Sequence, residues 1–94
     1  PHVRNNIRHS WHLFVIKTQQ RSELMKHLKS KNIGFGIHYP LTLPEQPAFK
    51  KHFENCRSFK AVSCSPFIMS LPIGEHLEET EIRYVADSLI YFFK

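Results

Sequence analysis

The sequence predicts a small α/β (α+β) domain in which a sheet of three strands carries packed helices. The chain has 94 residues, which is the length of one domain. Its residues are 41% hydrophobic and 22% charged, a globular composition that excludes disorder. Short apolar runs alternate with segments of helical period, in the order strand, helix, strand, a loop with helices, strand, helix.

The first strand is predicted over residues 11–16, Trp-His-Leu-Phe-Val-Ile. Apolar, β-branched and aromatic residues follow one another there, which is typical of a strand covered on both faces. Residues 21–31 form an amphipathic helix with one buried stripe, made by Leu24, Met25 and Leu28. We expect Ser22 to cap the start of this helix and Asn32 to take the left-handed turn at its end.

Residues 33–39 are predicted to form a short strand that Gly34 and Gly36 weaken. A glycine inside a strand often marks a place where another group approaches the backbone closely. Three prolines then fall within eight residues and predict a stiff, extended loop. Within that loop, residues 46–53 are expected to form one short helix that begins with Pro47.

In the last part of the chain, the residue pattern predicts a helical segment, a strand, a turn and a helix. Residues 58–69 have helical composition, and Pro66 should start, kink or end a helix there. Residues 70–73 are expected to form an edge strand because of Pro72, and residues 74–76 a turn. A final helix over 79–93 follows from an apolar repeat of three or four: Ile82, Val85, Ala86, Leu89 and Phe93.

The net charge of +5 favours anionic partners, such as nucleic acid, anionic lipid or phosphorylated small molecules. The basic residues are scattered, however, so a solvated surface stays an alternative. Cys56 and Cys64 form neither a zinc nor a redox motif, which favours a reduced, cytoplasmic protein. No apolar run approaches the ~18 residues of a membrane span. The chain begins with Pro1 rather than Met, so we expect a piece of a longer protein, with residues 1–8 as an extension or linker.

No catalytic motif and no metal site is predicted. His9 and His12 would face opposite sides of a strand, so they cannot chelate one metal together. His27 and His52 are expected at the surface. Cys64 is expected to be a buried small hydrophobe. Three serines have no identifiable base: Ser63, Ser65 and Ser70.

His38 and Tyr39 form the one constellation that suggests a site. A glycine-flanked strand end delivers both residues into the proline-rich loop. Imidazole and phenol groups are good donors and acceptors for phosphate or sugar hydroxyls. The alternative is that both residues end a strand and pack under the loop.

Several segments in order resemble one family. They are Trp11 to Ile16, the helix that begins with Arg21, the Gly-Ile-His-Tyr-Pro motif at 36–40, Gln-Pro-Ala-Phe at 46–49, Ser-Leu-Pro-Ile at 70–73 and the helix over 79–93. Together they resemble the C-terminal small domain of the DegT/DnrJ/EryC1/StrS aminotransferases. The resemblance implies a single domain over 1–94 with a three-stranded, largely antiparallel sheet, as in fold-type-I aminotransferases.

The resemblance also implies a pyridoxal-phosphate enzyme that transaminates nucleotide-linked keto sugars, using an amino-acid donor. In that family the cofactor lysine lies in the larger domain, so this chain alone should be inert, with no catalytic or cofactor-binding residue. His38 and Tyr39 are the expected substrate-binding residues, near the active-site entrance and a dimer interface. The alternatives are a related sugar dehydratase, a regulator, or a stand-alone module that binds anions or nucleic acid.

The sequence departs from the family pattern at several places. Leu43-Pro44-Glu45 stands where members commonly carry a histidine, and Phe49 stands for a tyrosine, so contacts from these positions are in doubt. The loop and the strand before it crowd more apolar residues than a small core can bury: Phe35, Ile37, Tyr39, Leu41, Leu43, Phe49 and Phe53. We therefore expect an apolar interface, so that the isolated domain self-associates or is only marginally stable.

Overall fold

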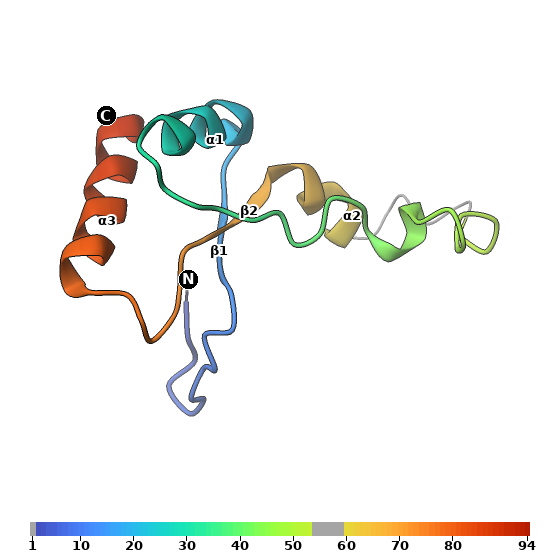
Figure 1. The fold of residues 1–94 in the computed structure, drawn as a ribbon. Helices are drawn as coiled ribbons and strands as arrows, with labels where there is room; N and C mark the ends of the chain where they lie inside the picture. Colours follow the sequence, from blue (N-terminus) through green and yellow to red (C-terminus); the bar gives the residue numbers. More distant parts are fainter. Residues whose placement is uncertain (1, 54–59) are drawn as a thin grey trace.

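The computed structural model describes residues 2–53 and 60–94 (Figure 1). The elements, in chain order, are β1 (Phe14–Lys17), α1 (Arg21–Ser30), the 3-10 helix η1 (Leu43–Glu45), α2 (Lys60–Cys64), the 3-10 helix η3 (Ser65–Phe67), β2 (Ile68–Leu71) and α3 (Glu79–Phe93). The predicted α/β class is confirmed. The prediction of three strands is wrong, because the sheet has two among the described residues.

The sheet pairs β1 with β2 in antiparallel register, with Phe14 opposite Leu71. The third predicted strand, residues 33–39, is reduced to one bridge in which Gly36 pairs with Ser70. Glycine loses more backbone entropy than other residues when it becomes extended, so this segment pairs at a single point. The strand predicted at 70–73 begins earlier, at Ile68, and ends at Leu71, before Pro72. Its outer edge is paired at one residue, because Ser70 forms the bridge to Gly36 on the side away from β1.

The first strand is shorter than predicted. Trp11 has a φ of 52°, a left-handed conformation that interrupts the extended chain, so β1 begins only at Phe14. Within β1, Phe14 and Ile16 are half-buried while Val15 and Lys17 are exposed. The strand is therefore covered on one face, and the predicted coverage of both faces is wrong.

Helix α1 supplies the centre of the core. Leu24 and Leu28 are fully buried beside Met69 of β2. Asn32 has a φ of 56°, which confirms the left-handed turn that ends this helix. The predicted Ser22 cap is wrong: Gln20 occupies that position, and its N–H donates to Thr18 Oγ1 at 3.1 Å.

Helix α3 packs beside α1 with three of its nine hydrophobic residues (Figure 1). Val85, Leu89 and Phe92 face the core, whereas Ile82 and Phe93 of the predicted stripe are exposed. His27 links the two helices, because its Nε2–H donates to the Ser88 carbonyl at 3.0 Å and its ring stacks near Tyr91 and Phe92. The expectation that His27 lies at the surface is wrong.

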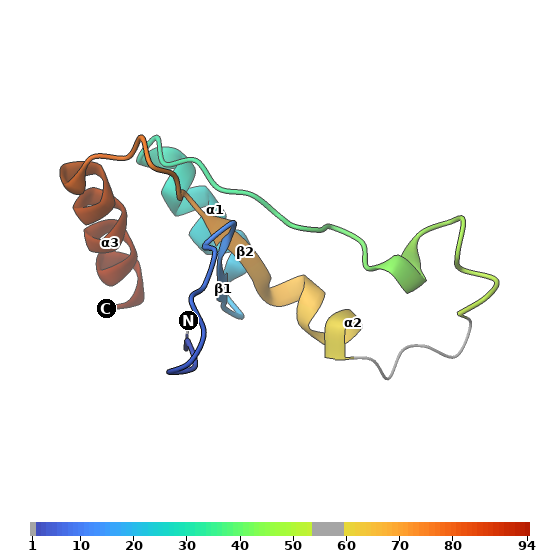
Figure 2. The same cartoon turned by 90° about the horizontal axis from the view of Figure 1, so that it is seen from below.

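Residues 39–53 form an extension that leaves the rest of the molecule in both views (Figures 1 and 2); we call it the arm. The helix predicted at 46–53 is a series of turns, preceded by η1, since hydrogen bonds such as Lys50 N–H to the Gln46 carbonyl do not continue into a second helical turn. Pro66 lies in η3 directly after α2, as predicted for a residue that ends a helix. Residues 58 and 59 of that predicted segment, and Cys56, lie outside the described residues.

The molecule is extended because of the arm. Its radius of gyration is 15.8 Å, whereas a compact chain of this length has about 12 Å. Its accessible surface of 8036 Å² exceeds the value of a compact protein of 11.1 kDa by roughly 2,400 Å². Within the described residues, none of the helices is both long and apolar enough to cross a membrane.

Candidate functional site

The candidate site lies where the chain leaves the core and enters the arm. Gly36 and Ser70 exchange two backbone hydrogen bonds, with N···O distances of 3.0 and 2.8 Å. This bridge fixes the chain two residues before His38. The arm begins immediately afterwards, at Tyr39. The pairing of two segments distant in the sequence thus sets where His38 and Tyr39 stand.

The imidazole of His38 turns back onto the bridge. Its Nδ1 lies 2.9 Å from Ser70 Oγ, in hydrogen-bonding distance. A Cβ placed on Gly36 would overlap His38 Cε1, so only glycine leaves room for the ring in this position. The predicted close approach at a strand glycine is therefore confirmed at Gly36. At Gly34 it is wrong, since nothing lies within 4 Å of a Cβ there.

Tyr39 stands beside His38 and is open to solvent. Its side chain is 71% exposed, and the two rings meet edge to face with centroids 5.8 Å apart. His38 is also exposed, and its Nε2 has no hydrogen-bond partner within residues 2–53 and 60–94. The two predicted residues therefore lie together, and both are exposed. An imidazole and a phenol so placed suit a ligand with phosphate or hydroxyl oxygens.

Ser70 belongs to this site, although the sequence showed no base near it. The base is His38, which comes 32 residues earlier and meets Ser70 only through the bridge. Ser70 is 4% exposed, and its hydroxyl bonds to Nδ1, the ring nitrogen on the inner side. A buried hydroxyl cannot reach a substrate, so the arrangement suits a support for the imidazole and not a nucleophile.

The arm has one local hydrogen-bond motif. The Thr42 hydroxyl and N–H both donate to Glu45 Oε2, at 2.7 and 2.9 Å. These two bonds, led by the one from the hydroxyl, lower the pKa of the Glu45 carboxyl from its ordinary 4.5. None of the arm's residues is buried, and its large apolar side chains are exposed: Tyr39, Leu41, Leu43, Phe49 and Phe53.

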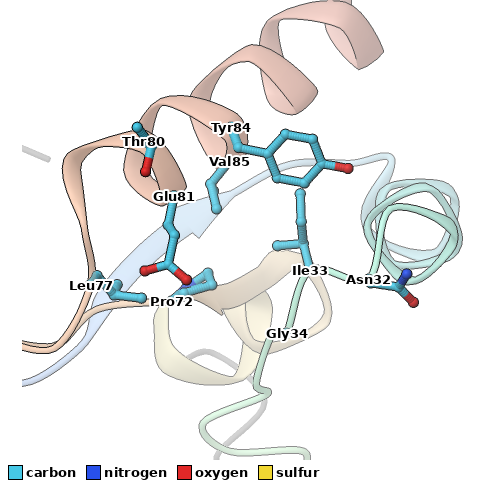
Figure 3. A pocket seen from close by; sticks show the side chains of 9 residues that line it. All are labelled: Asn32, Ile33, Gly34, Pro72, Leu77, Thr80, Glu81, Tyr84 and Val85. Carbon is cyan, nitrogen blue, oxygen red and sulfur yellow. The ribbon is translucent and has the colours of Figure 1, made fainter.

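A hollow of about 300 Å³ lies elsewhere, between the turn after α1 and the first half of α3 (Figure 3). Ile33, Pro72, Leu77 and Val85 make most of its wall apolar, and the Tyr84 hydroxyl at its edge donates to the Lys31 carbonyl. The Glu81 carboxylate in it already accepts the Glu78 N–H at 2.9 Å. None of the predicted site residues lines this hollow.

The lysines do not fit a cofactor-bound amine. A Schiff-base lysine needs a desolvated amine of lowered pKa. All eight lysines lie in the described residues and all are exposed: Lys17, Lys26, Lys29, Lys31, Lys50, Lys51, Lys60 and Lys94. Lys17 is typical, since its Nζ finds only Cys64 Sγ at 3.8 Å. Cys64 itself is half-buried, so the expectation of full burial is wrong.

The remaining candidates do not assemble into a site. His9 accepts the Trp11 N–H on its Nδ1 at 2.8 Å, and His12 is exposed nearby. His52 is exposed in the arm, as predicted. Across residues 2–53 and 60–94, no three histidine, cysteine, aspartate or glutamate side chains come close enough together to hold a metal ion.

Comparison with known proteins gives a consistent result. Residues 1–90 match the DegT/DnrJ/EryC1/StrS aminotransferase family. A relative named dTDP-3-amino-3,4,6-trideoxy-alpha-D-glucose transaminase, from Streptomyces venezuelae, is 36% identical over 84% of this chain and 21% of its own length. The erythromycin biosynthesis sensory transduction protein EryC1, from Saccharopolyspora erythraea, is 35% identical over 85% of this chain and 22% of its own length.

A solved structure agrees with these sequence matches. It is described as S. venezuelae DesV in complex with ketimine intermediate. It superposes with a TM-score of 0.80 and 32% identity, covering 87% of this chain and 22% of that one. The chain thus spans about a fifth of the length of the relatives it matches.

Proposed function

We propose that this chain, which belongs to the DegT/DnrJ/EryC1/StrS aminotransferase family, is the C-terminal small domain of an enzyme that transaminates a nucleotide-linked keto sugar. The domain would comprise residues 1–94, with 1–8 as a linker. The observation that carries the proposal is the exposed pair His38 and Tyr39, held at the root of the arm. The family is pyridoxal-phosphate dependent, and the matched transaminase is named for a dTDP-sugar.

His38 and Tyr39 would bind and orient the substrate. Nε2 of His38 has no hydrogen-bond partner in residues 2–53 and 60–94, and the Tyr39 side chain is 71% exposed. Both groups suit phosphate or sugar oxygens. The cofactor and the amino donor would bind to the part of the protein outside this chain, because none of its exposed lysines fits the cofactor. The basic net charge of +5 also favours a phosphorylated substrate. Cysteine usage supports a cytoplasmic parent protein.

The arm would be covered in the complete protein. Roughly 2,400 Å² of surface beyond that of a compact domain is more than one side of a standard interface, about 800 Å². The arm exposes five large apolar or aromatic side chains, and aromatic residues are enriched in the core of interfaces, although its last part also exposes Lys50 and Lys51. We propose a homo-oligomer in which the arm contacts protein outside its own domain.

The test is steady-state kinetics of the full-length protein with pyridoxal phosphate, an amino-acid donor and a dTDP-linked keto sugar. His38→Ala and Tyr39→Phe should raise KM for the sugar nucleotide roughly three- to tenfold each, since each removes one hydrogen bond. KM for the amino donor should not change. Tyr91→Phe is the matched control, because Tyr91 is 74% exposed on α3 and belongs neither to the candidate site nor to the arm. Absence of transaminase activity with any such sugar would overturn the proposal.

Labelling with the cofactor tests the division of roles. Pyridoxal phosphate followed by borohydride should label the lysines of the 94-residue chain weakly and without selectivity, because all eight are exposed amines. The full-length protein should be labelled at one lysine outside these residues. Selective labelling of a single lysine within residues 1–94 would contradict the proposal.

A regulatory role is the second candidate, favoured by the relative EryC1, which is named a sensory transduction protein. A regulator that binds a sugar nucleotide would use the same exposed pair. It would give the same loss of ligand affinity with His38→Ala but no transamination in the full-length protein. Measuring binding and turnover together therefore separates the two candidates.

A further inference from the structure

We propose that Ser70 and Gly36 are positioning residues that hold the His38 imidazole in one orientation before a ligand arrives. The inference rests on the proposed substrate-binding role of His38. Neither Ser70 nor Gly36 would touch the ligand: each acts through the ring, Ser70 by a hydrogen bond and Gly36 by the absence of a side chain.

The sheet holds Ser70 in place independently of its contact with the His38 ring. It is buried in β2, where its backbone pairs with Val15 of β1 on one side and with Gly36 on the other. Its Oγ therefore has little freedom to move away from His38 Nδ1, at 2.9 Å. A short hydrogen bond from a buried, doubly paired strand residue is a rigid attachment for an otherwise exposed side chain.

Gly36 forms the surface against which the ring lies. The three atoms nearest to a Cβ on Gly36 would be Cε1, Nδ1 and Nε2 of His38, and the first of them would overlap it. The ring therefore occupies the space that any other residue at position 36 would fill. Position 34 has no such requirement, because a Cβ there meets nothing within 4 Å.

The direction of the hydrogen bond sets what His38 offers to a ligand. Within the described residues, Nδ1 is the one acceptor in reach of the Ser70 hydroxyl. If Nδ1 carried the proton, the buried hydroxyl hydrogen would lose its only acceptor, an unfavourable state. The hydroxyl therefore donates to Nδ1, and in the neutral ring the proton is on Nε2. His38 then presents an N–H donor on Nε2, the ring nitrogen that bonds to no group of the described residues.

A donor fixed in advance favours binding of an anionic or hydroxyl-rich ligand. A side chain that is already ordered does not lose conformational freedom when the ligand binds. The ligand chemistry that fits is a phosphate or sugar oxygen that accepts from Nε2. Loss of the Ser70 hydroxyl should therefore weaken binding through His38 and through no other residue.

The first test measures the ring in the 94-residue chain by NMR. A nuclear Overhauser effect between His38 Hε1 and the Gly36 Hα protons is expected in the wild type. It should disappear in Ser70→Ala and remain in Ser70→Thr, which keeps the hydroxyl. Ser88→Ala is the control, because Ser88 is also buried but its hydroxyl donates to the Tyr84 carbonyl within α3. Persistence of the effect in Ser70→Ala, or its loss in Ser88→Ala, would overturn the proposal.

Gly36→Ala provides an independent test if Ser70→Ala does not fold. It should displace the ring and abolish the contact between His38 Hε1 and residue 36, while Gly34→Ala should preserve the contact to Gly36. An unmoved ring in Gly36→Ala would contradict the packing role.

The second test measures KM for the sugar nucleotide in the full-length protein. Ser70→Ala should raise it roughly three- to tenfold, with kcat unchanged, and should have no effect when His38 is already alanine. An equal effect in both backgrounds would mean that Ser70 acts by general destabilisation, and the proposal would fail. If the NMR contact responds as expected but KM does not, the substrate role of His38 fails and the positioning role stands.

Discussion

The body of the molecule, formed by β1, β2, α1 and α3, differs sharply from the arm. All five residues of the buried hydrophobic core belong to the body or to the turn after α1: Leu24, Leu28, Ile33, Met69 and Leu71. The arm contributes none, although six of its fifteen residues are hydrophobic. The body therefore has a buried core, whereas none of the arm's apolar side chains is buried.

We propose that the two regions have different partners. The body buries part of its apolar residues in a core of its own, although α3 also exposes Ile82 and Phe93. The arm holds local turns and one short 3-10 helix and buries none of its apolar side chains. His38 and Tyr39 lie at the boundary between them. The rigid region thus positions the proposed ligand contacts, and the exposed region supplies a surface for other parts of the protein.

The largest expected effect is on the free energy of unfolding, and it comes from making the same substitution at one leucine in the body and one in the arm. Leu28→Ala removes a fully buried side chain from the core and should lower the free energy of unfolding by about 2–5 kcal/mol. Leu43→Ala removes a side chain that is 69% exposed in the arm and should change it by less than about 0.5 kcal/mol. Urea unfolding followed by circular dichroism measures both. Equal effects would mean that the arm packs into the body.

The second effect concerns association. The 94-residue chain should self-associate, because the apolar side chains of its arm are exposed. Sedimentation over a hundredfold concentration range measures this association. Replacing three arm residues by serine, Tyr39, Leu41 and Leu43, should weaken association more than tenfold, since ~100 Å² of lost apolar contact is worth about 2.5 kcal/mol. The matched control replaces three equally apolar, exposed residues of α3: Ile82, Ile90 and Phe93.

The two triple variants locate the interface. A stronger effect from the α3 variant would place the interface on that helix and not on the arm. A wild-type chain that remains monomeric throughout, with a cooperative melt well above ambient temperature, would contradict the expected interface altogether.

The smallest effect is local to the arm. Because the Thr42 bonds lower the pKa of Glu45, the carboxylate stabilises η1 above pH 4.5 and loses this contribution as the pH falls through the lower folded value. An NMR titration of the Glu45 carboxyl carbon should give a midpoint below 4.5. Thr42→Val should move the midpoint toward 4.5, and Thr42→Ser should not. A wild-type midpoint at or above 4.5 would mean that the arm lacks even this local order.

Local patterns predicted much of the fold. The apolar period of Leu24 and Leu28 placed α1, the glutamates and the repeat after Gly74 placed α3, and Asn32 marked a helix end. These signals arise from residues within a few turns of one another. The strand count was wrong because the pairing of residues 33–39 depends on contact with β2, which no local pattern contains.

The candidate site was predictable only where its signal is local. Gly36 and Pro40 lie on either side of His38 and Tyr39, so the sequence pattern indicated these two residues. Ser70 could not be linked to His38, because their contact joins segments 32 residues apart. His27 was placed at the surface because its neighbours in α1 are polar, while the α3 residues that cover it come some 60 residues later.

Amide hydrogen exchange of the 94-residue chain, alone and within the full-length protein, tests most directly whether the two regions have different partners. Amides of α1, β2 and α3 should be protected in both samples, because their core lies within the chain. Amides of residues 39–53 should exchange rapidly in the isolated chain and be protected in the full-length protein, where the arm is covered. Equal protection of the arm in both samples, or equal exposure in both, would contradict the account.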